Sequence, residues 1–200
     1  MRGSCCGTSP HGRRVHQAAE ALSGRVLSVN VAEPRLIETG QGLVMSGIDK
    51  QPVKGARMMR ALGFEGDRQA NLAVHGGPYK AVYVYPHEHY ADWAAELSRE
   101  AGAPGWFGEN LTTTGLLETT VRIGDALRVG GALVEVTQPR TPCFKLTAKM
   151  RVHGFERMFH RSGRSGWYVA VLEEGLVQAG DAVTLEATAG GPTVLEALRE

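Results

Sequence analysis

The side chain best placed to do chemistry in this sequence is Cys143, which lies in the phrase QPRTPCFKL at residues 138–146. Two prolines stiffen this phrase, so the loop can hold one side chain in a fixed direction. The neighbouring Arg140 and Lys145 favour the thiolate, which is the form of cysteine that acts as a nucleophile or binds a metal. These residues alone leave a second interpretation open, in which Cys143 is a small buried hydrophobic side chain.

A second phrase, GDRQANLAVHGGPYK at residues 66–80, has groups that suit an anion. The paired Gly76 and Gly77 let backbone N–H groups approach a phosphate closely, and His75 and Lys80 can donate hydrogen bonds to it. Any turn can use a Gly-Gly-Pro sequence, so a purely structural loop is the alternative. The phrase predicts an anion-binding loop only in combination with other features.

A third phrase, WFGENL at residues 106–111, places Glu109 and Asn110 directly after an aromatic pair. Side chains of these types are suited to positioning a ligand, but they also stabilise turns through local hydrogen bonds. From this phrase alone both interpretations stay open.

His87 and His89 lie two residues apart in the sequence HEH, which resembles a zinc-binding pattern. On a helix, residues two apart point to different sides, whereas the known helical zinc motif has its histidines four apart. We therefore expect no zinc site here. The sequence also shows no Gly-rich loop of the types that bind nicotinamide, flavin or nucleoside phosphates, and no serine nucleophile elbow.

The elements that must position these residues are mainly short strands. Alternating arms on either side of Gly130-Gly131 predict a β-hairpin over residues 124–136, which leads directly into the cysteine loop. An apolar face predicts a helix from Pro86 to about Glu100. We predict a mixed α+β, β-rich fold, a mostly antiparallel β-barrel with short peripheral helices. Further strands are expected at residues 25–31, 81–85, 167–172 and 180–185, and a short helix at 155–163.

Length and composition favour one domain without bulk electrostatic partners. The chain has 200 residues and a net charge of +1, so we expect neither a nucleic-acid nor a membrane partner. Three cysteines, and no apolar run near the roughly 20 residues that span a bilayer, favour a soluble, cytoplasmic protein. We expect a disordered leader at residues 1–23, the domain at 24–188, and a C-terminal tail or short helix at 189–200.

Taken together and in this order, the three phrases resemble the MOSC domain. More narrowly, they are similar to stand-alone bacterial MOSC proteins associated with detoxification of N-hydroxylated bases such as 6-hydroxylaminopurine. Matching phrases run from about Val29 to Leu185. One phrase could arise by chance, but the three at consistent separations are specific.

The resemblance implies a barrel like that of pyruvate kinase and a molybdenum cofactor whose metal binds the thiolate of Cys143. A soft thiolate suits molybdenum that carries sulfur ligands. His75 is then the expected catalytic proton donor, because a histidine titrates near neutral pH. The groups expected to contact the phosphate, the pterin or the substrate are Gly76, Gly77, Lys80, Asn110, Arg140 and Lys145.

Three functions follow as hypotheses. The first is a molybdenum-dependent oxidoreductase that reduces N-hydroxylated small molecules with electrons from a separate reductase. This protein could form a homodimer. The second is a non-catalytic carrier of the cofactor, or of sulfur on Cys143. The third is a metal-free cysteine enzyme that uses Cys143 and His75. Pyridoxal phosphate binding is associated with the family only through larger proteins that carry an additional domain.

Overall fold

The structure is a computed structural model that describes residues 22–68 and 76–200. Seven strands form a closed barrel in the order β13-β9-β10-β11-β7-β8-β1, because β13 also pairs with β1. Six of the seven neighbouring pairs are antiparallel and one, between β7 and β8, is parallel. The predicted β-rich, mostly antiparallel barrel is thus confirmed. The barrel strands are β1 (Ser23–Val31), β7 (Val82–Pro86), β8 (Leu111–Thr114), β9 (Ala126–Val129), β10 (Ala132–Pro139), β11 (Trp167–Glu173) and β13 (Ala182–Ala187).

Short strands extend from this barrel, as the many glycines and prolines of residues 33–80 predict. Strands β2 (Arg35–Thr39) and β3 (Gly42–Ser46) form a hairpin of their own, and β4 (Gln51–Pro52) pairs with β1. A small three-stranded sheet contains β5 (Arg57–Arg60), β6 (Gly63–Phe64) and β12 (Gly175–Val177). The single 3-10 helix of the described residues, η1, covers Pro78–Lys80.

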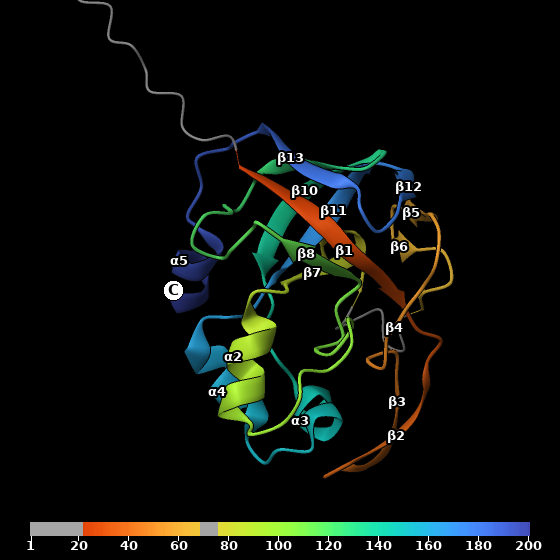
Figure 1. Cartoon of the computed structure of the whole chain (residues 1–200), viewed down its shortest axis with the longest axis vertical. Helices are drawn as coiled ribbons and strands as arrows, with labels where there is room; N and C mark the ends of the chain where they lie inside the picture. Colours follow the sequence, from red (N-terminus) through yellow and green to blue (C-terminus); the bar gives the residue numbers. More distant parts are fainter. Residues whose placement is uncertain (1–21, 69–75) are drawn as a thin grey trace, which may run out of the picture.

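Four short helices accompany the barrel within the described residues. Figure 1 shows α2 (His89–Glu96), α3 (Phe144–Met150) and α4 (Phe155–Ser162) together beyond one end of the barrel, and α5 (Val194–Arg199) beside it. No helix of residues 22–68 and 76–200 has the length and apolar character needed to cross a bilayer. The expected leader falls almost entirely on residues 1–21, which lie outside the described residues.

The helix predicted from Pro86 to Glu100 is shorter than expected. Pro86 is the last residue of β7, where it pairs with Thr113 of the parallel strand β8, and the His87 N–H continues this pairing by donating to the Thr113 carbonyl at 2.8 Å. The helix ends at Glu96, and Ser98 takes a positive φ of 50°. A proline suits a first helical turn, but Pro86 belongs to β7 because it pairs with Thr113 of β8.

Two apolar clusters hold the fold together. The first fills the barrel, largely with valines such as Val134 and Val169, because β-branched side chains pack well on a pleated surface. The second is mainly aromatic and lies between the barrel and helices α2 and α4. It buries Tyr90 and Trp93, the two aromatic residues of the predicted helix face. Burying each such large side chain stabilises the fold by about 1.5–3 kcal/mol.

Candidate functional site

A pocket at the helical end of the barrel brings together residues that lie far apart in the sequence. The elements that contribute are the end of β3, the η1 helix, strands β7 and β11, the loop before β8, and the loop from β10 into α3. Five predicted site residues line this pocket: Lys80, Asn110, Arg140, Cys143 and Lys145. The other lining residues are Ser46, Gly47, Ile48, Lys50, Arg68, Tyr83, Gly108 and Tyr168.

Cys143 lies where the loop after β10 turns into α3. Its backbone is extended, with φ −129° and ψ 169°, and its carbonyl accepts the Leu146 N–H at 2.9 Å in the first turn of the helix. The side chain is half-buried in the pocket wall. The sequence predicts the stiff loop but not the helix α3. This helix begins directly after Cys143 and so fixes the cysteine on its C-terminal side.

Arg140 is the most buried cation of the pocket, at 6% exposure. Its guanidinium lies 4.9 Å from the ring centre of Tyr83 and 5.4 Å from that of Phe159, so aromatic faces stabilise its charge. Burial acts to lower the pKa of Arg140, but Tyr83, Tyr168 and Cys143 raise it above the ordinary value. Within the described part of the chain, its buried Nη1 atom has no hydrogen-bond partner. A charged donor therefore lies in the pocket wall.

Other cations surround the same pocket. The Lys145 ammonium donates to the Met45 carbonyl at 3.0 Å, which ties α3 to the end of the β2–β3 hairpin. Arg68 is exposed and lies 3.8 Å from Glu33, and Lys80 ends the η1 helix. Positive charge at the pocket therefore has three separate origins along the chain, which suits a negatively charged ligand.

Asn110 acts inside the protein. Its Nδ2 donates both to the Asn30 carbonyl at 3.3 Å and to Asp67 at 2.9 Å, and its Oδ1 accepts the Tyr83 N–H at 3.2 Å. Asp67 in turn pairs with Lys50, whose Nζ lies 2.5 and 2.7 Å from the two carboxylate oxygens. Because both amide hydrogens of Asn110 are used, this residue positions the pocket wall.

Glu109, next to Asn110, is a buried structural residue. Its carboxylate accepts hydrogen bonds from the Tyr90 hydroxyl, from the Thr112 hydroxyl at 2.9 Å, and from the backbone N–H groups of Gly105 and Phe107 at 2.8 and 3.0 Å. Of the two interpretations of the WFGENL phrase, the structure supports turn stabilisation for Glu109.

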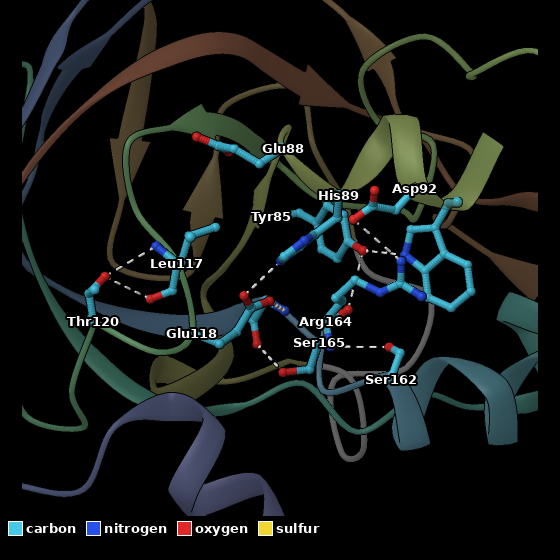
Figure 2. A network of polar contacts seen from close by, with 12 residues as sticks. Tyr85, Glu88, His89, Asp92, Leu117, Glu118, Thr120, Ser162, Arg164 and Ser165 are labelled. Atoms are coloured by element: carbon cyan, nitrogen blue, oxygen red, sulfur yellow. Dashed lines mark hydrogen bonds and ion pairs between the residues drawn. The ribbon is translucent and has the colours of Figure 1, made fainter. Parts of the chain in front are cut away.

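The segment that leads into β11 is fixed by a polar network, shown in Figure 2. Buried Glu118 accepts the Gly166 N–H at 2.7 Å through one oxygen, and its other oxygen lies 2.8 Å from the His89 ring nitrogen. The Gly166 carbonyl accepts the Arg140 N–H at 3.3 Å. This network holds Gly166, the residue before the strand that contains Tyr168, and it includes His89 but not His87. In the described residues no cluster of three or more histidine, cysteine and acidic side chains could hold a metal ion.

The remaining predicted residues lie elsewhere. His75 falls outside the described residues, so its role stays a prediction. Gly76 and Gly77 are not among the residues that line the pocket; Gly77 has a φ of 88° and directly precedes η1. Glycine adopts this positive φ readily because it has no Cβ.

Sequence reasoning missed several pocket residues, above all Tyr83, Tyr168 and the Lys50–Asp67 pair. Tyr83 and Tyr168 lie in strands whose alternation predicts the fold but not which strand ends meet. Asp67 is part of the GDRQ sequence within the second phrase, but nothing in that phrase indicates Lys50 as its partner.

Comparisons with known proteins agree with this geometry. The model of the MOSC domain matches residues 71–184, more than half of the chain. YflK of Bacillus subtilis is 47% identical over 155 residues, covering 78% of this chain and 70% of YflK. YiiM of Escherichia coli is 43% identical over 155 residues, covering 76% and 69%.

A longer relative and a solved structure extend the comparison. A protein from Gibberella moniliformis named as a reductase is 39% identical over 147 residues, which make up 72% of this chain but 26% of that protein. The crystal structure of YiiM from Geobacillus stearothermophilus has a TM-score of 0.73 at 33% identity and covers 88% of this chain and 82% of its own. The chain therefore belongs to the MOSC domain family, with stand-alone relatives of the YiiM type.

Proposed function

We propose that this protein binds a molybdenum cofactor through Cys143 and reduces N-hydroxylated compounds, such as hydroxylaminopurine-type bases. MOSC domains are associated with the molybdenum cofactor in general. The observation that carries the proposal for this chain is the position of Arg140, a buried cation with an unpartnered Nη1 beside a half-buried cysteine. A buried donor without a partner costs about 1–3 kcal/mol, which a ligand that accepts its hydrogen bond recovers.

The donor set of the pocket fits a group that offers both a soft metal and a phosphate. The thiolate of Cys143 suits a metal with sulfur ligands, whereas Arg140, Lys80, Lys145 and Arg68 supply positive charge for a phosphate. Asn110 supports this wall from behind through Asp67 and Tyr83. We assign Cys143 to the metal and the cations to the anionic parts of the cofactor.

The reaction consumes two electrons and two protons, converting R–NHOH to R–NH₂ and water. When bound, the cofactor supplies the two-electron chemistry that cleaves the N–O bond. The residues of the chain bind and orient the substrate in the pocket, where Arg140 keeps its charge. His75 remains our candidate for proton delivery.

Electrons for this reaction are proposed to come from a separate protein. The sequence has no pattern typical of a nicotinamide or flavin site. The relative from Gibberella moniliformis that is named a reductase supports this view, because the part similar to this chain is only 26% of its length. We infer that the remaining part of such a protein supplies electrons, which this chain receives from a partner protein.

The test is the molybdenum content of protein purified from a host that makes the cofactor. Wild type should contain close to one molybdenum per chain, and Cys143→Ala should lose it. Cys143→Ser is the matched variant, because it keeps nearly the same size but replaces sulfur by oxygen; it should lose molybdenum as well. Thermal unfolding confirms that both variants are folded.

Turnover is measured on the same preparations with 6-hydroxylaminopurine as substrate and a reduced viologen dye as electron donor. Reduction by wild type and not by the variants would support the oxidoreductase. Stoichiometric molybdenum without turnover would favour a carrier of the cofactor. Wild type without molybdenum, from a host in which a known molybdoenzyme is loaded, would overturn the proposal and favour metal-free cysteine chemistry.

A further inference from the structure

Two tyrosines line the pocket side by side. Tyr83 of β7 and Tyr168 of β11 are direct partners in the antiparallel register, and their ring centres lie 5.4 Å apart. The hydroxyl of Tyr83 is committed to the fold, because it donates to the Ser165 carbonyl at 2.8 Å in a buried position. Tyr83 therefore has no hydroxyl proton to offer a ligand.

The hydroxyl of Tyr168 is used differently. Tyr168 lies near Arg140, whose positive charge opposes the rise in the Tyr168 pKa that burial causes. A guanidinium can only donate hydrogen bonds, so Arg140 cannot accept the phenol proton. Across residues 22–68 and 76–200, no group accepts that proton in a hydrogen bond.

The position of Tyr168 relative to Cys143 gives this proton a role. Both residues line the pocket, Tyr168 is partly exposed to it, and the two lie close enough to interact electrostatically. The ring of Tyr168 packs against that of Tyr83, and the Glu118–Gly166 network fixes the residue that precedes the same strand. The phenol is therefore a fixed donor in the pocket wall that Cys143 also lines.

We infer that the Tyr168 hydroxyl donates a hydrogen bond to the oxygen of the substrate N–OH group and thereby distinguishes an N-hydroxylated base from its amine product. This inference rests on the proposed function. An N–OH oxygen can accept the bond, but the amine product has no oxygen at that place. A site built to bond a polar group discriminates against the analogue that lacks it, because the donor of the site is then left without a partner.

A purely supportive role for the hydroxyl predicts something else. If the Tyr168 hydroxyl only held Arg140 in place, its loss would affect the hydroxylated base and the amine equally. A direct hydrogen bond instead affects the hydroxylated base alone. The ratio of the two dissociation constants therefore separates the two roles.

The experiment measures the Kd of 6-hydroxylaminopurine and of adenine by calorimetry on molybdenum-loaded protein without an electron donor, so that neither base is converted. Wild type should prefer 6-hydroxylaminopurine. In Tyr168→Phe this preference should fall about tenfold, which corresponds to about 1.4 kcal/mol. Tyr85→Phe is the matched control: it removes a tyrosine hydroxyl that donates to the Arg164 carbonyl at 3.2 Å and does not line the pocket, should lower the thermal unfolding midpoint, and should keep the wild-type preference.

An unchanged preference in Tyr168→Phe, with both variants folded, overturns the inference while the proposed function stands. Equal binding of the two bases by wild type also overturns it. Reduction of 6-hydroxylaminopurine by the same wild-type preparation, measured with a viologen donor, decides the proposed function separately. A loss of preference in both tyrosine variants would show an indirect effect through the fold and would likewise contradict a specific role for Tyr168.

Discussion

Lys50 and Asp67 form a buried ion pair next to the pocket, with Nζ 2.5 and 2.7 Å from the two carboxylate oxygens and side-chain exposures of 8% and 2%. Desolvation makes such a pair costly unless the remaining hydrogen-bonding positions are filled. Here they are filled, because the Asp67 carboxylate also accepts the Ala32 N–H at 2.8 Å and the Asn110 amide at 2.9 Å. Asp67 thus joins three separate segments at the pocket wall.

Asp67→Asn should lower the free energy of unfolding by about 3 kcal/mol, because it leaves Lys50 buried without a counter-charge. Burial already lowers the pKa of Lys50 and Asp67 opposes this effect, so the substitution should lower that pKa further. Urea unfolding measures the change. The control is Arg35→Ala, which breaks an ion pair with Asp49 whose arginine is 67% exposed; it should cost less than about 1 kcal/mol. Equal losses of unfolding free energy in Asp67→Asn and Arg35→Ala would show that the buried ion pair stabilises the protein no more than the exposed one.

The barrel could be predicted because its signals are local. The Gly130-Gly131 turn between two alternating arms indicates the β9–β10 hairpin directly, and the structure pairs Ala132 with Val129 across it. The extent of α2 could not be predicted in this way, since Pro86 is held by its pairing with Thr113 in β8. A local preference gives way when a distant strand supplies a partner.

The candidate site also combines residues that local patterns predict with residues that only tertiary pairing brings together. Arg140 and Cys143 lie in one stiff phrase, so their proximity could be predicted from spacing. Tyr168 reaches them only because β11 pairs with β10, and the Gln138–Tyr168 register places it at the end of the hairpin. Lys50 comes from a loop with no recognisable pattern. Residues contributed by tertiary pairing leave no signal in the spacing of a single sequence.

Gly166→Ala should destabilise the protein by about 2 kcal/mol or more. Gly166 has a φ of 61°, and an added Cβ would lie 2.3 Å from the Val84 carbonyl oxygen. Strained backbone at such a position costs about 1–3 kcal/mol, and the clash adds to it. Gly180→Ala is the control, since Gly180 has a φ of 96° but open space around it. Thermal unfolding of both variants separates the clash from the backbone strain, and equal shifts would mean that the clash is relieved.

Helix α5 should make part of the free energy of unfolding depend on pH in the acid range. The pKa of Glu196 lies below its ordinary value of 4.5, because its carboxylate accepts hydrogen bonds from the Thr193 N–H and hydroxyl in a capping box. The folded state therefore releases this proton more readily than the unfolded state. Its contribution is present above pH 4.5 and is lost as the pH falls through the lowered pKa.

Glu196→Gln removes the charge and should flatten the stability profile below pH 5, as urea unfolding between roughly pH 3 and 6 would show. Thr193→Ala removes the capping side chain and should cost about 1 kcal/mol at neutral pH. A profile that stays as steep in Glu196→Gln as in wild type would assign the acid sensitivity to other carboxylates.

Arg140→Lys tests what the guanidinium contributes to retention of the proposed cofactor. Lysine keeps the positive charge but lacks the planar group that lies over Tyr83 and Phe159 and carries the unpartnered Nη1. Removing such a supporting contact typically lowers affinity for a metal group by roughly 10- to 100-fold. Molybdenum per chain after extensive dialysis should therefore fall well below the wild-type value. The same exchange at the exposed Arg157 of α4 should leave it unchanged. If Arg140→Lys retains molybdenum as wild type does, charge alone is sufficient and the geometry of the guanidinium has no part in binding.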